Sequence, residues 1–431
     1  MNSLNTTEAA SNMNWLQKYF LQCPYRVFAA LFLMFIAFGF IYATPTEIAQ
    51  GLWTIIISPD ILVTDYITIA GLGATYVNVA LSGLLSLLVM VLAKHDPNGL
   101  TLGTFGLVMG FAFFGKNPVN MLPIIFGGYL YSKIAKEPFN RYCIGPILAT
   151  CLAPVVTQLA FVEHIGPHLG IAIGILLGIF IGLVINPIAK SVRVTGDGYN
   201  LYNIGFAGGL IAIGIMLVYR TLGIDFVLLS IWSEGYNLQL GIFLLAVSIY
   251  FIICGLLSNG KSTFAEMTHM KTEDVDFYTQ FGGKTYINVG LMGIFCFIFM
   301  FLVQGEYNGP VIGAILSVVG FGAFGKRLLS AIPIMAGAML AAFAAMALTG
   351  IPFNSREFLV AAIFSTCLSP LATKFGWKWG VIAGFVHLAF AVNVAIFHGG
   401  MNLYNNGLAG GLAALLLLPI IRTFDRKRLV K

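Results

Sequence analysis

The chain has 431 residues, of which 58% are hydrophobic and only 9% are charged. A soluble domain carries about 25% charged residues, so this composition excludes a soluble enzyme of this size. Apolar runs of membrane length recur along the whole chain, which excludes a disordered, collagen-like or coiled-coil protein. The net charge of +6 informs membrane orientation rather than nucleic-acid binding. The sequence predicts an all-α, polytopic integral membrane protein.

Each half of the chain contains seven apolar segments that we expect to be helical. The third and fourth segments are the shortest of the first half, where Gly115 and Pro118 interrupt them, and the third is the shortest of the second half. We group the third and fourth segments of each half as a pair. Each pair forms either two tilted spans or one re-entrant hairpin. The segments cover about 26–43, 67–93, 101–115, 119–135, 142–161, 167–189 and 199–219, and then about 239–259, 286–304, 308–324, 328–348, 356–373, 379–397 and 401–420.

Internal repetition decides the predicted architecture. Four patterns of the first half return in the same order in the second, two of them at one offset, since 285 − 75 and 326 − 116 both equal 210. The chain is therefore a duplication. The pairs are TYVNVALSG at 75–83 and TYINVGLMG at 285–293, FGK at 114–116 and 324–326, TCLAP at 150–154 and TCLSP at 366–370, and NLYNIGFAGGL at 200–210 and NLYNNGLAGGL at 402–412.

An odd number of crossings in each half inverts the second half relative to the first, and a re-entrant pair leaves that parity unchanged. With both termini cytoplasmic, only Lys116, Arg220 and Arg356 of the 23 Lys and Arg residues fall outside. We therefore expect two inverted structural repeats in the cytoplasmic (plasma) membrane. The predicted parts are a cytoplasmic segment 1–24, a first repeat 25–220, an external linker 221–238, a second repeat 239–421 and a basic cytoplasmic tail 422–431.

Inverted repeats create a pseudo-twofold axis in the membrane plane, where many transporters bind their solutes. The duplicated Asn-x-Tyr-Asn pattern opens the last segment of each repeat and is followed by glycines that allow close backbone approach. Its side chains either line a solute site or form a capped helix start packed through small residues. The candidates are Asn200, Tyr202 and Asn203, and Asn402, Tyr404 and Asn405.

Asn78 and Asn288 form a second symmetric pair, inside otherwise apolar segments. A buried amide in lipid needs hydrogen-bonding partners or water. With Thr75 and Thr285 beside them, these asparagines either form a polar collar that faces the solute pathway or join helices by hydrogen bonds.

Lys116 and Lys326 follow the same Phe-Gly pair in the two repeats. Each either presents a cation to an anionic solute at a helix junction, or marks a span end and extends its ammonium group to water. Thr157 and Thr373 are expected to hydrogen-bond back to their own helices.

Several absences narrow the function. None of the 17 acidic residues lies in the middle of a clear span, which disfavours a proton-coupled pump. No zinc-protease, Walker or Ser/His/Asp pattern can be placed. We therefore expect no enzymatic activity and no bound metal or cofactor.

Residues 198–203 (GYNLYN) and 400–405 (GMNLYN) carry a family resemblance. With them the chain resembles, over nearly its whole length, a family of uncharacterised bacterial multi-spanning membrane proteins known as a domain of unknown function, which implies no activity. A fainter likeness, in the glycines of 380–384 and 399–410, is to urea transporters, which are also inverted duplications. That likeness implies a solute pathway, but their pore-lining acidic residue has no counterpart here.

The sequence thus predicts a channel or facilitator that passes a small polar solute between the repeats. A Na⁺-coupled secondary transporter is one alternative, because unwound backbone carbonyls can hold Na⁺ without carboxylates. A non-transporting membrane scaffold or enzyme subunit is the other, and it predicts a packed axis without a polar cavity. The expected partners are the small-molecule solute and the lipid bilayer, and we expect no nucleic acid to bind. The sequence is also compatible with a homo-oligomer.

Overall fold

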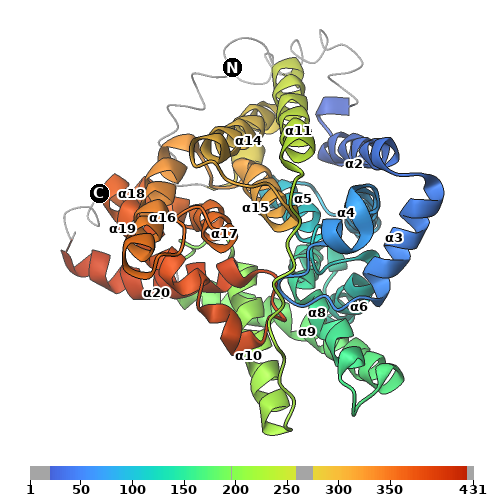
Figure 1. The fold of residues 1–431 in the computed structure, drawn as a ribbon. Helices are drawn as coiled ribbons and strands as arrows, with labels where there is room; N and C mark the ends of the chain where they lie inside the picture. The colour runs from blue at the N-terminus through green and yellow to red at the C-terminus, as the bar shows by residue number, and fades with distance from the viewer. Residues whose placement is uncertain (1–19, 196, 259–274, 425–431) are drawn as a thin grey trace.

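Helices form nearly all the regular structure of residues 20–195, 197–258 and 275–424, which this computed structural model describes (Figure 1). Ten helical segments in that part are long and apolar enough to cross a membrane, which confirms the predicted all-α polytopic class. The helices of the first repeat are α2 (Pro24–Tyr42), α3 (Pro45–Ile57), α4 (Tyr66–Leu92), α5 (Gly99–Phe111), α6 (Pro118–Ile134), α7 (Ile144–Ala149), α8 (Ala153–Thr157), α9 (Pro167–Thr195) and α10 (Asn203–Thr221). Those of the second are α11 (Asn237–Ser258), α13 (Phe277–Phe281), α14 (Thr285–Leu302), α15 (Gly309–Gly320), α16 (Leu328–Thr349), α17 (Arg356–Ser365), α18 (Ser369–Phe375), α19 (Trp377–Ala391) and α20 (Asn405–Phe424).

The two halves of the chain use corresponding helix pairs. In the first half α2 packs on α4 and α6 packs on α9, while in the second α11 packs on α14 and α16 packs on α19. The halves meet through α5 against α15, near the centre of Figure 1, and through α10 against α20. The expected terminal segments 1–24 and 422–431 lie mostly outside the described residues.

Small residues set the closest approach between the halves. Gly106 faces Gly320, and Gly110 faces Gly313. The contacts run forward along α5 and backward along α15, so these two helices are antiparallel. A Cβ atom at Gly106 would lie 2.7 Å from the Leu316 carbonyl oxygen, and glycine is therefore what allows the backbones to pack at this distance.

Two aspartates join the halves reciprocally. Asp65 caps α4 and also accepts a hydrogen bond at 2.9 Å from the backbone N–H of Gly309, at the start of α15. Asp276 caps α13 and accepts a 2.8 Å hydrogen bond from the N–H of Gly99, at the start of α5. Each carboxylate thus satisfies an otherwise unpaired N–H at the positive end of a helix in the other half. The two halves therefore exchange equivalent contacts.

Helix α3 is absent from the expected segments, which leave residues 44–66 between the first span and the second. The sequence does contain a helix-start signal there: Thr44 and Glu47 form a capping box, and Pro45 takes the first helical position. Ile48 and Ile55 are buried, and α3 packs on α4. The helix has 13 residues and is not among the ten segments long enough to cross a membrane.

The expected segments 142–161 and 356–373 are broken rather than continuous. Each contains a 3₁₀ turn over Thr-Cys-Leu, at Thr150–Leu152 and at Thr366–Leu368, shortly before a proline. Proline has no N–H to continue the helical ladder. The breaks leave backbone carbonyls in the protein interior that need partners from elsewhere.

The connections between the third and fourth segments are buried. Helix α5 has 13 residues, or about 20 Å at 1.5 Å per residue, which is less than the hydrocarbon core of about 30 Å. Ala112, Phe113 and Phe114, which follow α5, are at most 2% exposed. The junction between α5 and α6 therefore lies inside the protein rather than at a water-facing loop.

Candidate solute-binding site

The two Asn-Leu-Tyr-Asn segments, 200–203 and 402–405, have the same local geometry. The Asn200 side-chain oxygen accepts a hydrogen bond from the Tyr202 N–H at 3.0 Å, and Asn402 does the same for Tyr404 at 3.0 Å. Asparagine favours such turns because its short side chain reaches the backbone two residues on. Asparagine at the first position therefore holds each tyrosine directly before the first residue of the helix that follows, α10 or α20.

The last asparagine of each segment joins that helix to the preceding one. The Asn203 amide donates to the Ala189 carbonyl at 2.8 Å, and the Asn405 amide donates to the Ala391 carbonyl at 2.6 Å. These bonds agree with the alternative in which Asn203 and Asn405 have a structural role at the start of a packed helix. They do not prevent Asn203 from also lining the cavity described below.

Each segment also crosses to the broken helix of the other half. The Leu201 N–H donates to the Cys367 carbonyl at 3.0 Å, and the Leu403 N–H donates to the Cys151 carbonyl at 2.9 Å. These carbonyls belong to the two 3₁₀ turns. These two bonds give partners to backbone carbonyls that lose their helical hydrogen bonds at the breaks. They also bring both Asn-Leu-Tyr-Asn segments to the centre of the molecule.

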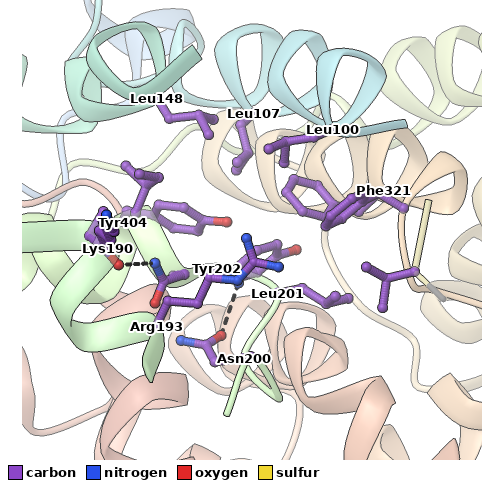
Figure 2. A pocket seen from close by; sticks show the side chains of 16 residues that line it. Leu100, Leu107, Leu148, Lys190, Arg193, Asn200, Leu201, Tyr202, Phe321 and Tyr404 are labelled. Carbon is purple, nitrogen blue, oxygen red and sulfur yellow. Dashed lines mark hydrogen bonds between the residues drawn. The ribbon is translucent and has the colours of Figure 1, made fainter. Parts of the chain in front are cut away.

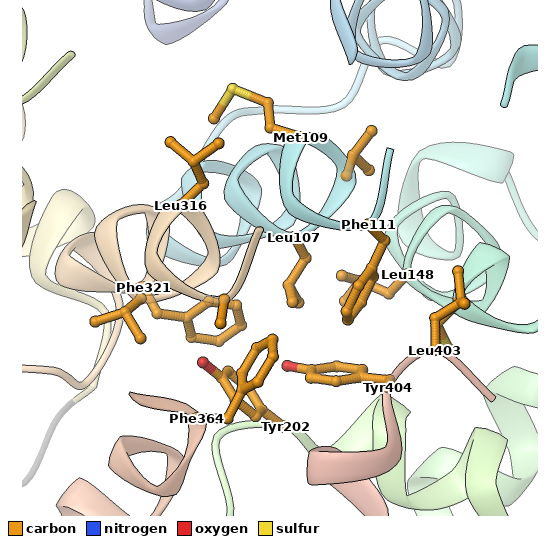
Figure 3. Close-up of a cluster of buried hydrophobic side chains, with 14 of the residues drawn as sticks. Leu107, Met109, Phe111, Leu148, Tyr202, Leu316, Phe321, Phe364, Leu403 and Tyr404 are labelled. Carbon is orange, nitrogen blue, oxygen red and sulfur yellow. The ribbon is translucent and has the colours of Figure 1, made fainter. Parts of the chain in front are cut away.

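Tyr202 and Tyr404 meet at this centre, with ring centroids 4.7 Å apart. Tyr202 also packs edge-on against Phe321 at 4.9 Å, and Tyr404 packs edge-on against Phe111 at 5.1 Å. Figure 3 shows these rings with Phe364 and aliphatic side chains around them. At this point the contact between the halves is aromatic, rather than the continuous water-filled pathway that an open channel requires.

Lys116 and Lys326 are buried, with exposed fractions of 1% and 0%. The interpretation of these lysines as water-facing span ends is therefore wrong, because the junctions that carry them fold into the protein. The Lys326 ammonium donates hydrogen bonds to the Tyr202 hydroxyl and, at 2.9 Å, to the Thr366 hydroxyl. The Lys116 ammonium lies 5.3 Å from the centroid of the Phe111 ring, and no described residue accepts a hydrogen bond from it.

A cavity of about 260 Å³ reaches the tyrosine pair from one side (Figure 2). Four of the candidate residues line it: Asn200, Tyr202, Asn203 and Tyr404. Lys190 and Arg193, near the end of α9, are exposed and line it as well. Its apolar lining includes Leu100, Leu107, Leu148, Leu201, Phe321 and Phe324.

The symmetry-related side is filled instead. Helix α9 continues to Thr195, whereas α19 ends at Ala391 and is followed by a 3₁₀ turn, Val394–His398. His398 is buried and hydrogen-bonds the Asn405 side-chain oxygen at 2.9 Å. The Leu62 N–H donates to the Gly400 carbonyl at 3.0 Å, so residues 58–65 pack over this mouth. Asn402 and Asn405 do not line the cavity.

Asn78 and Asn288 support the buried junctions. The Asn78 amide donates to the carbonyls of Ala112 and Lys116 at 2.8 and 2.9 Å. The Asn288 amide donates to those of Gly322 and Lys326, both at 2.7 Å. This is hydrogen bonding between segments, and neither asparagine lines the cavity.

The two threonines beside these asparagines also bond to backbone. The Thr75 hydroxyl donates to the Gly71 carbonyl at 2.8 Å, and the Thr285 hydroxyl donates to the Phe277 carbonyl at 3.0 Å. Neither threonine lines the cavity. The residues of the predicted polar collar, the two asparagines and the two threonines, therefore do not line the cavity.

Sequence reasoning missed Asp60, which is fully buried. Its carboxylate accepts hydrogen bonds from the Tyr66 hydroxyl, the Asn120 amide and the Thr157 hydroxyl, the last two at 2.9 Å. The expectation that Thr157 bonds back to its own helix is therefore wrong, whereas Thr373 does so, to the Ser369 carbonyl at 3.1 Å. The donors lie up to 97 residues from Asp60, so no local pattern could reveal the cluster.

The geometry defines a multi-span membrane protein built from two related halves, with a one-sided cavity at their junction. The chain belongs to the family described as "Protein of unknown function (DUF1576)", whose model matches residues 44–221 and 259–423. No curated protein and no solved structure matches the chain.

Proposed function

We propose that this protein is a transporter of the alternating-access type, which moves a small polar solute between two inverted repeats. One observation carries the proposal: among the described residues, one of two equivalent mouths opens as a cavity to the tyrosine pair, and the other is filled by residues 58–65 and 394–400. A duplicated chain can exchange these arrangements, so that the solute site faces each side of the membrane in turn.

The contact between the two tyrosine rings closes the centre of the molecule, which favours a carrier over a channel. Tyr202 and Tyr404 meet at the inner end of the cavity, so a solute passes only when the rings or the helices behind them move. A scaffold predicts a packed axis and no polar cavity. The aromatic cluster fits that alternative, but the cavity lined by Asn200, Asn203 and Lys190 favours transport.

The membrane orientation is part of the proposal. The antiparallel contact of α5 and α15 supports inverted repeats, because a twofold axis in the membrane plane reverses every span that it relates. Lys190 and Arg193 line the open mouth. The excess of basic residues in cytoplasmic loops supports a mouth that faces the cytoplasmic side of the plasma membrane, with both termini on the same side.

Cysteine accessibility tests the one-sided cavity. In a cysteine-free background, Leu201→Cys and Leu403→Cys place thiols at equivalent positions of the two segments, and only Leu201 lines the cavity. A membrane-impermeant maleimide is expected to label Leu201→Cys from the cytoplasmic face of oriented vesicles and to label Leu403→Cys far more slowly. Equal labelling of both positions from both faces indicates an open channel. No labelling of either position indicates a sealed scaffold.

Transport itself is tested by counterflow in liposomes. A carrier accelerates the entry of labelled solute when unlabelled solute is loaded on the opposite side, whereas a channel does not. Repeating the measurement with and without a Na⁺ gradient separates passive exchange from Na⁺-coupled accumulation. Absence of both counterflow and net flux, for every solute that binds, contradicts the proposal.

A further inference from the structure

Two tyrosine hydroxyl protons at the inner end of the cavity have no acceptor among the described residues. The Tyr404 hydroxyl is buried and has no hydrogen-bond partner among the described residues. The Tyr202 hydroxyl accepts from Lys326, and no described residue accepts its proton. Both tyrosines line the cavity, and in Figure 2 the Tyr404 hydroxyl is directed toward the other lining side chains. A buried donor without an acceptor costs free energy, so this end of the cavity suits a ligand rich in acceptors.

Two buried lysines at the same place have no carboxylate partner among the described residues. Lys326 is 0% exposed, and both hydrogen bonds of its ammonium group go to neutral hydroxyls, those of Tyr202 and Thr366. Lys116, its counterpart, lies on the Phe111 ring that packs against Tyr404. No described carboxylate forms an ion pair with either lysine. Burial without a counter-ion makes the protonated form of a lysine costly, and an anionic ligand lowers that cost.

The route to this place is also positive. Lys190 and Arg193 line the outer part of the cavity, and neither forms an ion pair with a described acidic residue. A mouth lined by one sign of charge raises the local concentration of ligands of the opposite sign. The entrance and the inner end of the cavity therefore both favour an anionic ligand.

We propose that the cavity binds a small oxyanion, a carboxylate or a phosphoryl group, against the hydroxyls of Tyr202 and Tyr404, with Lys326 as the charge behind Tyr202. This inference deepens the proposed function and rests on it only for the step of transport. Binding needs just the conformation described here. The solute class is then an anion, in contrast to the neutral solute that a urea-transporter-like pathway would carry.

Calorimetry on the full-length protein in nanodiscs tests the binding. Acetate and succinate form the carboxylate arm, inorganic phosphate and methyl phosphate form the phosphoryl arm, and urea and glycerol are the neutral controls. We expect saturable binding in one oxyanion arm and none of the neutral controls. Binding of a neutral solute alone, or no binding in either oxyanion arm up to tens of millimolar, overturns the inference.

Three variants separate a binding role from a structural one. Tyr404→Phe keeps the ring and removes a hydroxyl without partners, so we expect about tenfold weaker binding and no loss of thermal stability. Lys326→Met should weaken binding by at least about tenfold, since it removes the buried charge. Lys133→Met, at an exposed lysine, should leave the affinity unchanged. Wild-type affinity in both Tyr404→Phe and Lys326→Met contradicts the assignment.

The same measurements distinguish the two proposals from each other. If an oxyanion binds and the variants lose affinity, but neither counterflow nor net flux occurs, the site assignment stands and transport fails. If a neutral solute shows counterflow while oxyanions neither bind nor move, transport stands and the oxyanion assignment fails.

Discussion

Lys326 of the second repeat donates a hydrogen bond to the hydroxyl of Tyr202 in the first. The equivalent residues, Lys116 and Tyr404, make no such bond, and the Tyr404 hydroxyl remains without a partner among the described residues. A duplicated chain thus holds its two central lysines differently. The difference coincides with the one-sided cavity, and the proposed carrier function predicts such an asymmetry in each of its two states.

Lys116→Met is predicted to stabilise this state. The Lys116 ammonium is buried with no described hydrogen-bond acceptor, so an apolar side chain of similar length removes a desolvation cost of about 1–3 kcal/mol. Thermal unfolding in detergent, followed by near-ultraviolet circular dichroism, should show a higher Tm. Lys133→Met, at an exposed lysine, is the control. A lower Tm for Lys116→Met contradicts the idea that the charge is uncompensated.

Asn78→Ala and Asn288→Ala are each predicted to destabilise the protein by about 1–3 kcal/mol. Each asparagine donates to two buried carbonyls at a helix junction, and alanine leaves both without partners. Chemical denaturation measures the change, and Asn393→Ala is the control, because Asn393 is exposed and bonds only within its own turn. Equal stability of all three variants would show that the amides do not support the junctions.

Gly205→Ala is predicted to disrupt the contact between the halves, because a Cβ atom there collides with the Tyr404 ring. Gly214→Ala, nine residues later in the same helix, has nothing within 4 Å of the added carbon and should stabilise α10 by up to about 1 kcal/mol. The pair is compared by thermal unfolding. If both alanines raise the Tm, the close packing of α10 on the other half is not required.

Asp65→Asn is predicted to cost about 2–4 kcal/mol. One carboxylate oxygen accepts three hydrogen bonds, from the N–H and hydroxyl of Ser233 and from the N–H of Gly309. An amide cannot replace the charge, and one of its two positions is a donor. Asp225→Asn removes only an exposed ion pair with Arg220 and should cost less than about 1 kcal/mol. Similar losses in the two variants argue against a structural role specific to Asp65.

Part of the candidate site was readable from the chain itself. The Asn-Leu-Tyr-Asn pattern was found by its repetition, and the structure brings Asn200, Tyr202, Asn203 and Tyr404 to one cavity. Asn78 and Asn288 were found in the same way, but their amides are used within the protein. Repetition identifies positions that matter to both halves, and it does not distinguish a ligand contact from a structural hydrogen bond.

The sequence by itself determined the membrane class and the duplication, because composition and repetition can be read from the chain without knowing which residues are in contact. Only the tertiary structure decided that Lys116 and Lys326 are buried, that Asp60 gathers three donors and that one mouth is open while its counterpart is filled. These features depend on contacts between residues that are far apart in the chain. The Asn-Leu-Tyr-Asn patterns are nearly the same in both halves, and the difference between the mouths arises from the segments that pack around them, 58–65 and 394–400.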